Sequence, residues 1–456
     1  MSMPVEAEMA EAFVARAAKR RVRDARLVVC RGEEAVLRVA TSDGHRVHAE
    51  SAGRLAFPLG SLTKPFTATL AMLLVEDGDV DLDEPVSEHL PELAGADGSA
   101  TGITVRRLLS HRAGLASDLP EGAADPKDWM SRLCHQHALV CPPGTAFSYS
   151  NAGYAVVGRL IEAVTGMRWC DAVESILLRP LEISPVVLGS GIGGARPVAR
   201  GHTVHAGGVE AVVAERHRYG PGAAYGGLAL GVDDLVKFVH AHLGMDPLLG
   251  EQDGVARLMR TDQVIAGSPG PTGLADGWGL GWAVYRDTGV DWFGHDGMDD
   301  GLSCHLRFEP STGSVVALLS NSSGGFELWS DVVDLLRAGG TGVGDHPFLA
   351  GLSPDERTPP RPDCLGVYRN GEQEFVVGWG TDGQLSLRVG RAERGLLTCY
   401  GDGLRFALHD RANGRFLFRG AFVPDPDTGR VGLMRFAARL ARKEIDEQGA
   451  TGAGRG

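Results

Sequence analysis

Two residues near the start of the chain have the types and spacing needed for nucleophilic catalysis. Ser61 and Lys64 form an S-x-x-K pair, and apolar residues recur at helical spacing after Ser61. Pro65 fits only within the first turn of a helix, so we expect Ser61 at the helix start, where free N–H groups and the helix dipole favour an alkoxide. Burial would lower the pKa of Lys64 and make it a proton acceptor. The alternative is that Ser61 merely caps the helix.

Two later motifs supply further polar groups. Tyr149 and Asn151 form a Y-x-N motif before a predicted helix, and His295 and Gly297 form an H-x-G motif where a predicted strand ends in a sharp turn at Gly297. Three other triplets fit these patterns: residues 205–207, 242–244 and 368–370. We set these three aside. Residue 242 falls in a predicted helix, and residue 368 lies beyond a predicted linker. The order of the motifs along the chain favours Tyr149-Ser150-Asn151 and His295-Asp296-Gly297.

A further histidine, His111, lies near the end of a helix predicted from Thr104 to Arg112. Thr104 is a good helix cap, and a histidine at a helix end can bond the last carbonyl groups. We therefore predict a structural role for His111.

The elements that must position these residues indicate an α+β fold. The pattern predicts an N-terminal helix over residues 5–22, then strands within residues 25–40 and 46–52 that lead to the Ser61 helix. Three more strands are predicted over residues 278–285, 302–308 and 315–320, with a closing helix over 328–336. An antiparallel sheet with helices packed on it accounts for this order.

The character of the chain changes after residue 345. We predict a catalytic domain over residues 1–345, a proline-rich linker over 346–363, an all-β domain over 364–447 and a disordered tail over 448–456. Five short strands separated by turns are predicted in the all-β domain: residues 374–379, 384–389, 404–409, 415–419 and 432–437. This is enough for a small barrel or sandwich.

Bulk properties exclude several partners. The chain has 456 residues and a formal net charge of -13, and a surface of that sign repels nucleic acid. No apolar run approaches the roughly 20 residues of a membrane helix, and the N-terminus does not resemble a secretory signal, so we expect a cytoplasmic protein. The seven cysteines are widely spaced with no C-x-x-C pair, so we expect reduced thiols, no metal and no cofactor.

Taken together, these motifs resemble the serine β-lactamase and penicillin-binding-protein superfamily, on the branch of class C β-lactamases, D-stereospecific peptidases and esterases. The resemblance spans about residues 10–340. It also includes the sequence around His111, the Pro143-Gly144 pair before Tyr149, and Tyr225 with its following glycines. It implies a β-lactamase/transpeptidase-like domain, and the all-β domain resembles the lipocalin-like barrel attached to some members.

The resemblance implies a role for each motif residue. Ser61 would be the nucleophile, and Lys64 and Tyr149 would share the work of the base, with the proton unassigned between them. Asn151 would bond the substrate amide and Lys64. His295, which replaces a lysine found in many relatives, would hold the Tyr149 hydroxyl or relay its proton.

The same motif would supply the oxyanion hole. Gly297 would let the strand edge approach the substrate, and the N–H groups of Ser61 and Met298 would bind the oxyanion. Asp296, between His295 and Gly297, is placed with this substrate-binding group.

A chain without a recognisable secretory signal, with an H-x-G third motif and a C-terminal barrel, resembles the stand-alone penicillin-binding-protein-type thioesterases. The implied reaction is head-to-tail cyclisation of a nonribosomal peptide from a carrier-bound thioester, so the expected partner is a peptidyl thioester on a carrier protein, or a small peptide or ester. A D-stereospecific aminopeptidase or esterase, and a non-catalytic binding protein, are the alternatives. Arg435, on a predicted barrel strand, is our candidate cation for holding the peptide end, although an exposed structural arginine also fits.

Overall fold

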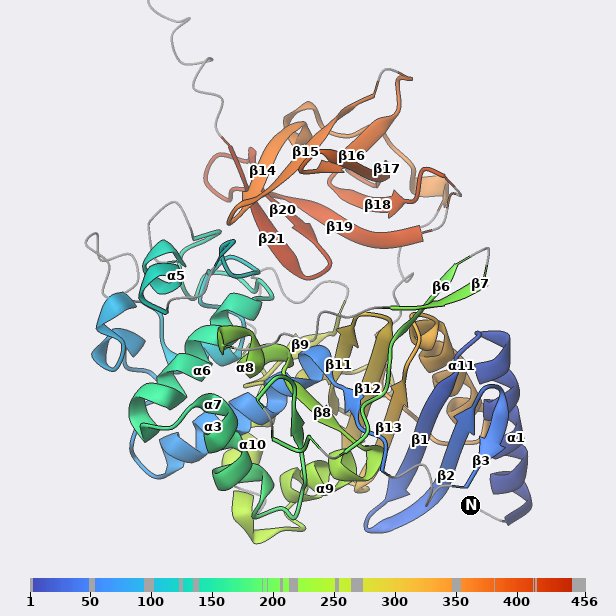
Figure 1. The fold of residues 1–456 in the computed structure, drawn as a ribbon. Coiled ribbons are helices and arrows are strands. Elements are labelled where there is room, and N and C mark those ends of the chain that lie inside the picture. The colour runs from blue at the N-terminus through green and yellow to red at the C-terminus, as the bar shows by residue number, and fades with distance from the viewer. Residues whose placement is uncertain are drawn as a thin grey trace, which may run out of the picture.

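The computed structural model describes residues 3–48, 54–93, 102–122, 126–133, 139–190, 192–194, 196–205, 208–212, 220–250, 254–263, 274–346, 354–380, 382–412, 414 and 416–444. Figure 1 shows two parts, a lower α+β domain and an upper β-barrel. Both parts of the predicted fold class are confirmed.

One eight-stranded antiparallel sheet forms the centre of the lower domain. Its strand order is β3-β2-β1-β13-β12-β11-β10-β9. The strands are β1 (Asp24–Arg31), β2 (Glu34–Ser42), β3 (His45–Val47), β9 (Gly277–Trp278), β10 (Ala283–Tyr285), β11 (Trp292–Asp299), β12 (Leu302–Glu309) and β13 (Ser314–Ser320). Smaller sheets hold β4 (Phe57–Pro58), β5 (Val186–Val187) and β8 (Leu228–Leu230), and the hairpin of β6 (His202–His205) and β7 (Gly208–Ala211).

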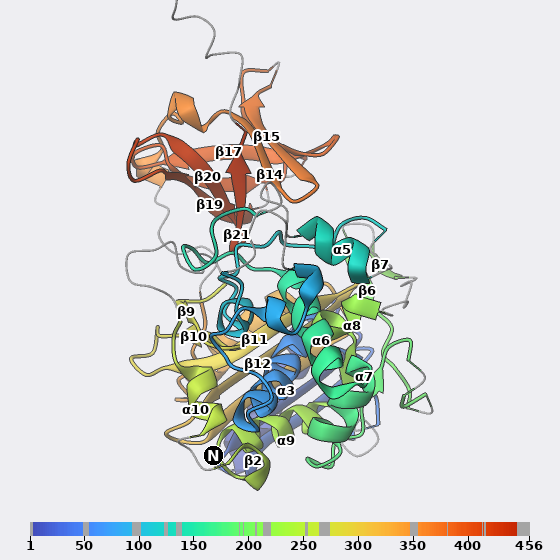
Figure 2. The ribbon, with the colours of Figure 1, turned by 90° about the vertical axis from the view of Figure 1, so that its left-hand side faces the viewer.

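Helices cover both faces of the central sheet because its strands are apolar on both sides. On β1, Val28 packs into one core, whereas the next residue, Val29, packs into the other. The first core takes in α3 (Lys64–Glu76), α6 (Asn151–Thr165) and α9 (Val232–His242), and Figure 2 shows α3 and α6 together on this side. The second core takes in α1 (Met3–Lys19) and α11 (Gly325–Ala338).

Shorter helices complete the lower domain. They are α4 (Val105–Leu109), α5 (Pro126–Leu133), α7 (Trp169–Ala172), α8 (Ala223–Gly226) and α10 (Val255–Arg260). A 3-10 turn, η1 (Gly60–Thr63), runs directly into α3. Among the described residues, no helix combines the length and apolar character that crossing a bilayer requires.

The predicted sharp turn at Gly297 is wrong. β11 continues through Gly297 to Asp299, and each residue from Phe293 onward pairs with β12. The chain turns instead at Asp300 and Gly301, where Gly301 has a φ of 66°. Gly297 therefore lies within a strand, where a glycine marks a close approach by another backbone.

The C-terminal part is a closed up-and-down barrel. Its eight antiparallel strands follow one another in chain order, and β14 pairs with β21 to close it. The strands are β14 (Gly366–Asn370), β15 (Gln373–Trp379), β16 (Leu385–Val389), β17 (Ala392–Tyr400), β18 (Arg405–His409), β19 (Phe416–Pro424), β20 (Val431–Phe436) and β21 (Arg439–Lys443). The five predicted strands are present, and β14, β17 and β21 were not predicted.

The barrel is docked on the lower domain. The turn between β20 and β21 reaches the lower domain, where the carbonyl of Ala438 accepts a bond of 2.9 Å from the N–H of Tyr149 (Figure 1). Of the predicted linker, residues 347–353 lie outside the described residues, and the remainder includes short 3-10 turns at Pro354–Glu356 and Pro362–Cys364. The predicted tail over 448–456 also lies outside them.

Candidate active site

Ser61 lies in the 3-10 turn that precedes α3, and Lys64 is the first residue of that helix. Pro65 occupies the first turn of α3, where its missing N–H is tolerated. The i, i+3 spacing brings Lys64 Nζ to 2.9 Å from Ser61 Oγ. Lys64 is fully buried, and its ammonium also donates to the carbonyl of Tyr225 at 3.3 Å. The predicted contact between Ser61 and Lys64 is therefore present.

Two glycines allow β11 to press against this turn. Gly60 has a φ of 51°, and a Cβ there would stand 2.0 Å from the carbonyl oxygen of Met298. A Cβ on Gly297 would stand 1.9 Å from the carbonyl oxygen of Leu59. The backbone of Met298 consequently runs beside Ser61, which is the arrangement that a two-amide oxyanion hole requires.

Tyr149 closes the site from the opposite side. Its hydroxyl is hydrogen-bonded to Ser61, and its ring centroid lies 4.9 Å from Lys64 Nζ. Burial raises the pKa of the phenol well above its usual value, and the bond to Ser61 and the charge of Arg439 only partly oppose this. The neutral phenol is therefore the resting form of Tyr149.

His295 faces the same cluster from β11. Its ring centroid is 6.3 Å from that of Tyr149, and its Nδ1 bonds the carbonyl of Asp296 at 2.6 Å. A carbonyl only accepts, so the neutral ring carries its hydrogen on Nδ1 and presents Nε2 as an acceptor. Nε2 is buried and has no hydrogen-bond partner in the described part of the chain. Burial and the charge of Lys64 lower the pKa of His295 to about 3.

Asn151 begins α6, beside Tyr149, but does not bond Lys64. Its Nδ2 donates to Asp118 at 2.7 Å, and its buried Oδ1 has no hydrogen-bond partner among the residues described. The predicted bond to Lys64 is thus absent from this geometry, and Oδ1 is left as an acceptor for a substrate N–H. Asp118 was not predicted as a site residue.

Asp296 does not face Ser61. Side chains alternate along a strand, so its carboxylate leaves β11 on the face opposite to His295. It accepts bonds from His305 and from the guanidinium of Arg307, at 2.8 Å each. Burial opposes its ionisation, but these two groups hold its pKa well below the usual range. The prediction that Asp296 binds substrate is corrected: its carboxylate fixes β11 from behind.

His111 has a structural role, but a different one from that predicted. The helix ends at Leu109, and His111 has a φ of 55°. Its Nδ1 accepts the N–H of Ser150 at 3.1 Å, and its ring lies 4.2 Å from that of Tyr149. Its ring thus holds the Y-x-N segment in place and does not bond the carbonyls at the helix end.

The barrel contributes a residue that we did not predict. Arg439 follows the turn between β20 and β21, and its guanidinium carbon lies 5.3 Å from the ring centroid of Tyr149. Arg435, the predicted cation, is 3% exposed and lies in the domain seam, near the buried thiol of Cys141. Burial lowers the pKa of Arg435 to about 10. The barrel cation beside the catalytic cluster is therefore Arg439.

A buried asparagine joins the two domains just behind Tyr149. Asn370 accepts the N–H of Ser117 at 2.7 Å, and its Nδ2 donates to Ser117 Oγ at 2.8 Å and to the Leu440 carbonyl at 2.6 Å. The carbonyl of Ser117 in turn accepts the N–H of Asn151 at 2.6 Å. Asn370, from the triplet 368–370 that we set aside as a catalytic motif, therefore holds the barrel against Ser117, which in turn bonds the Y-x-N segment.

A model of the Beta-lactamase family matches residues 9–337, more than half of the chain. The chain belongs to the beta-lactamase family. Penicillin-binding protein 4 of Amycolatopsis lactamdurans, a relative, is 35% identical over 292 residues, which cover 60% of this chain and 74% of that protein. Unguisins hydrolase ungD of Aspergillus violaceofuscus is 28% identical over 300 residues, which cover 58% of this chain and 52% of that protein.

The likeness to one solved structure extends over both domains. The crystal structure of SurE is 33% identical and matches with a TM-score of 0.81, covering 97% of this chain and 99% of that chain. The structure of SurE with D-Leu matches with a TM-score of 0.80. The chain is thus a β-lactamase/penicillin-binding-protein superfamily member whose C-terminal barrel fits a lipocalin-like domain.

In this beta-lactamase-family site, the arrangement suits acyl transfer through a serine. A hydroxyl, a buried amine and a buried phenol meet at one point, with backbone amides beside them. Across the described ranges, no group of three or more His, Cys, Asp or Glu residues could hold a metal ion. The described cysteines are buried free thiols.

Proposed function

We propose that this protein is a serine acyltransferase that takes a peptidyl group from a thioester onto Ser61 and releases it as a head-to-tail cyclised peptide. The observation that carries the proposal is the contact of Lys64 and Tyr149 with Ser61 beneath a turn of the barrel. The likeness to SurE over 97% of the chain, including a structure with D-Leu, supports a substrate with a D-residue at the acylated position.

In the first step, Ser61 Oγ attacks the thioester carbonyl carbon. As this bond forms, the Lys64–Tyr149 pair, both of whose polar groups contact Ser61, takes the serine proton. The N–H groups of Ser61 and Met298 receive the oxyanion. The carbon–sulfur bond then breaks, and the thiolate leaves with the proton that the lysine–tyrosine pair had taken.

In the second step, the N-terminal amine of the same peptide attacks the ester carbonyl. The amine loses a proton to the lysine–tyrosine pair, the bond from Ser61 Oγ to carbon breaks, and the serine regains its proton. Cyclisation requires that water reach the ester more slowly than the amine does. Arg439 and the β20–β21 turn cover Tyr149 on the side where the barrel docks, which supports such protection.

Hydrolysis is the second candidate, and the likeness to unguisins hydrolase ungD favours it. In that case the same acyl-serine forms, and water replaces the amine, as in a D-stereospecific aminopeptidase or esterase. The two outcomes share every residue named above and differ only in the acceptor.

Product analysis separates the two candidates. Wild-type protein would be incubated with a peptidyl thioester that has a free N-terminus and a C-terminal D-residue, beside Ser61→Ala. A cyclic product, lighter than the linear acid by one water, is expected from the wild type alone. A linear acid formed only by the wild type would establish the hydrolase, and equal turnover by Ser61→Ala would refute both.

A further inference from the structure

The barrel has a cavity at the end that faces the catalytic domain. It has a volume of about 420 Å³ and is lined by residues at the starts of β15, β17, β19 and β21 and at the ends of β16 and β20. Strands of an up-and-down barrel alternate in direction, so all of these strand ends lie at one mouth. Asp118 of the catalytic domain also lines the cavity, so the cavity opens toward that domain.

Two residues of the rim contact the catalytic cluster. Asp118 accepts the bond from Asn151 Nδ2 at 2.7 Å, and Arg439 lies over the ring of Tyr149. Tyr149 is in turn bonded to Ser61. The rim thus presents a carboxylate, which accepts peptide N–H groups, and a guanidinium, which donates to peptide carbonyls, beside Asn151 and Tyr149.

The wall of the cavity is mostly apolar, and Gln373 and Arg394 add polar groups to its lining. Phe375 and Phe436 pack with ring centroids 4.4 Å apart, and Phe418 lies 6.0 Å from Phe436. Leu387 is buried in the same cluster, and Leu417 is partly buried against it. A volume of this size with a mostly apolar wall and few polar groups at its rim matches the general character of a small-ligand site.

We propose that this mouth of the barrel is a subsite for an apolar side chain of the acyl group, carried by a residue upstream of the one esterified to Ser61. The inference rests on the proposed acyl-Ser61 intermediate and extends it to substrate selection. Discrimination of a large apolar side chain from alanine in such a pocket is on the order of 10- to 100-fold.

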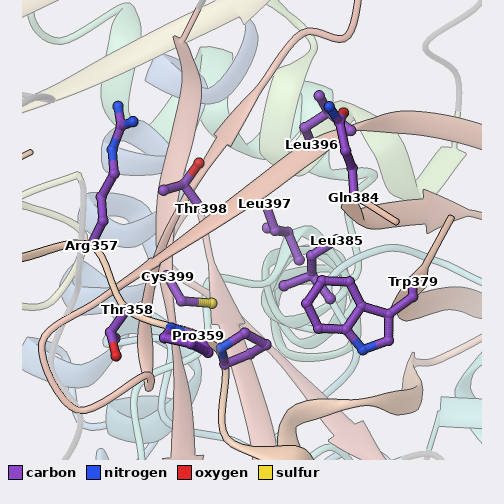
Figure 3. Close-up of a pocket in the computed structure, with 11 residues that line it drawn as sticks. Arg357, Thr358, Pro359, Trp379, Gln384, Leu385, Leu396, Leu397, Thr398 and Cys399 are labelled. Carbon is purple, nitrogen blue, oxygen red and sulfur yellow. The ribbon is translucent and has the colours of Figure 1, made fainter. Parts of the chain in front are cut away.

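The opposite end of the barrel supplies a matched control. A second groove there is lined by Trp379, Leu385 and Leu396 and by the segment around Pro359, as Figure 3 shows. Leu396 and Leu417 are both half-buried leucines on barrel strands. The paired variants are therefore Leu417→Trp, which fills the proposed subsite, and Leu396→Trp, which fills the far groove.

The experiment measures acylation of Ser61 by intact-protein mass spectrometry, so cyclisation and hydrolysis count equally. The substrates are short peptidyl thioesters with a C-terminal D-residue and phenylalanine at either of the two preceding positions, compared with alanine there. Wild type and Leu396→Trp should be acylated about 10- to 100-fold faster by one of the phenylalanine substrates than by the alanine substrate, and Leu417→Trp should lose this preference. Equal preference in all three proteins would overturn the subsite.

A binding measurement keeps the test independent of the reaction. The corresponding peptide amides, which do not acylate, would be titrated into Ser61→Ala protein by calorimetry, with and without Leu417→Trp. Loss of the phenylalanine preference in the double variant supports the subsite even if the thioesters fail to react. A failure of the thioesters to react would refute only the proposed function. Unchanged affinities, with circular dichroism showing folded protein, would refute the subsite itself.

Discussion

Replacement of Asn370 by alanine should weaken both the fold and the catalysis of this protein. The side chain is 4% exposed and makes two hydrogen bonds across the domain seam, to the N–H and hydroxyl of Ser117, and a third within the barrel, to the carbonyl of Leu440. Each such bond contributes about 0.5–1.5 kcal/mol, so their loss should lower the free energy of unfolding by about 2–4 kcal/mol.

The effect on catalysis follows from what the seam holds. The carbonyl of Ser117 accepts the N–H of Asn151, and the N–H of Tyr149 donates to Ala438 on the barrel. If the barrel shifts, the Tyr149 phenol moves relative to Ser61. Misplacement on the order of 1 Å costs about 100-fold in rate, so we expect Asn370→Ala to lower kcat by at least about tenfold.

A second buried asparagine provides the control. Asn321 is 2% exposed and bonds both the N–H and the carboxylate of Asp24, at 2.7 Å each, away from the seam. Urea unfolding and acylation kinetics would be measured for Asn370→Ala and Asn321→Ala. Both variants should lose stability, but only Asn370→Ala should lose kcat. If Asn370→Ala lost stability but kept the wild-type kcat, the barrel would play no part in placing Tyr149.

Three further predictions concern single side chains. Gly297→Ala should reduce kcat by about 100-fold, since a Cβ there would stand 1.9 Å from the Leu59 carbonyl oxygen and push β11 away from Ser61. Unchanged kinetics would show that the close approach of β11 to the Ser61 turn does not require a glycine at this position. Because the pKa of His295 falls from 6.5 to about 3 on folding, the unfolded chain binds a proton there that the native protein does not, so stability falls as the pH drops through this window. His295→Gln should flatten that decline by up to about 1.4 kcal/mol per pH unit in urea titrations, and an identical pH profile would contradict a buried neutral ring. Arg439→Ala should lower kcat, whereas Arg435→Ala should lower the unfolding temperature with kcat kept; the reverse pattern would restore Arg435 as the site cation.

The contact between Ser61 and Lys64 was predictable because its cause is local. Helical geometry places residues i and i+3 on one face, and Pro65 fixes where the helix starts. The antiparallel sheet was also predicted, because apolar runs such as Ser314–Ser320 are distinctive of buried strands, but the number and order of its strands were not. These parts of the fold and site follow from short-range rules.

The errors arise where the cause is distant in the chain. A glycine such as Gly297 signals a turn in most strands, and only the packing of β11 against η1 shows that it permits a close approach instead. Asp296 was grouped with the substrate-binding residues because it lies within the H-x-G motif, and only its position inside β11 shows that its carboxylate faces away from His295. Arg439 escaped notice because β21 was not predicted, and no local pattern reveals that a barrel turn will dock on Tyr149.

The central claim is that Ser61 becomes acylated with the help of Lys64 and Tyr149. Its most direct test is peptide mapping by mass spectrometry after brief exposure of the wild type, Ser61→Ala and Tyr149→Phe to a peptidyl thioester. The account predicts an acyl group on the peptide that contains Ser61 in the wild type, none in Ser61→Ala, and much slower acylation in Tyr149→Phe. An acyl group on any other residue, or acylation of Ser61→Ala at the wild-type rate, would contradict it.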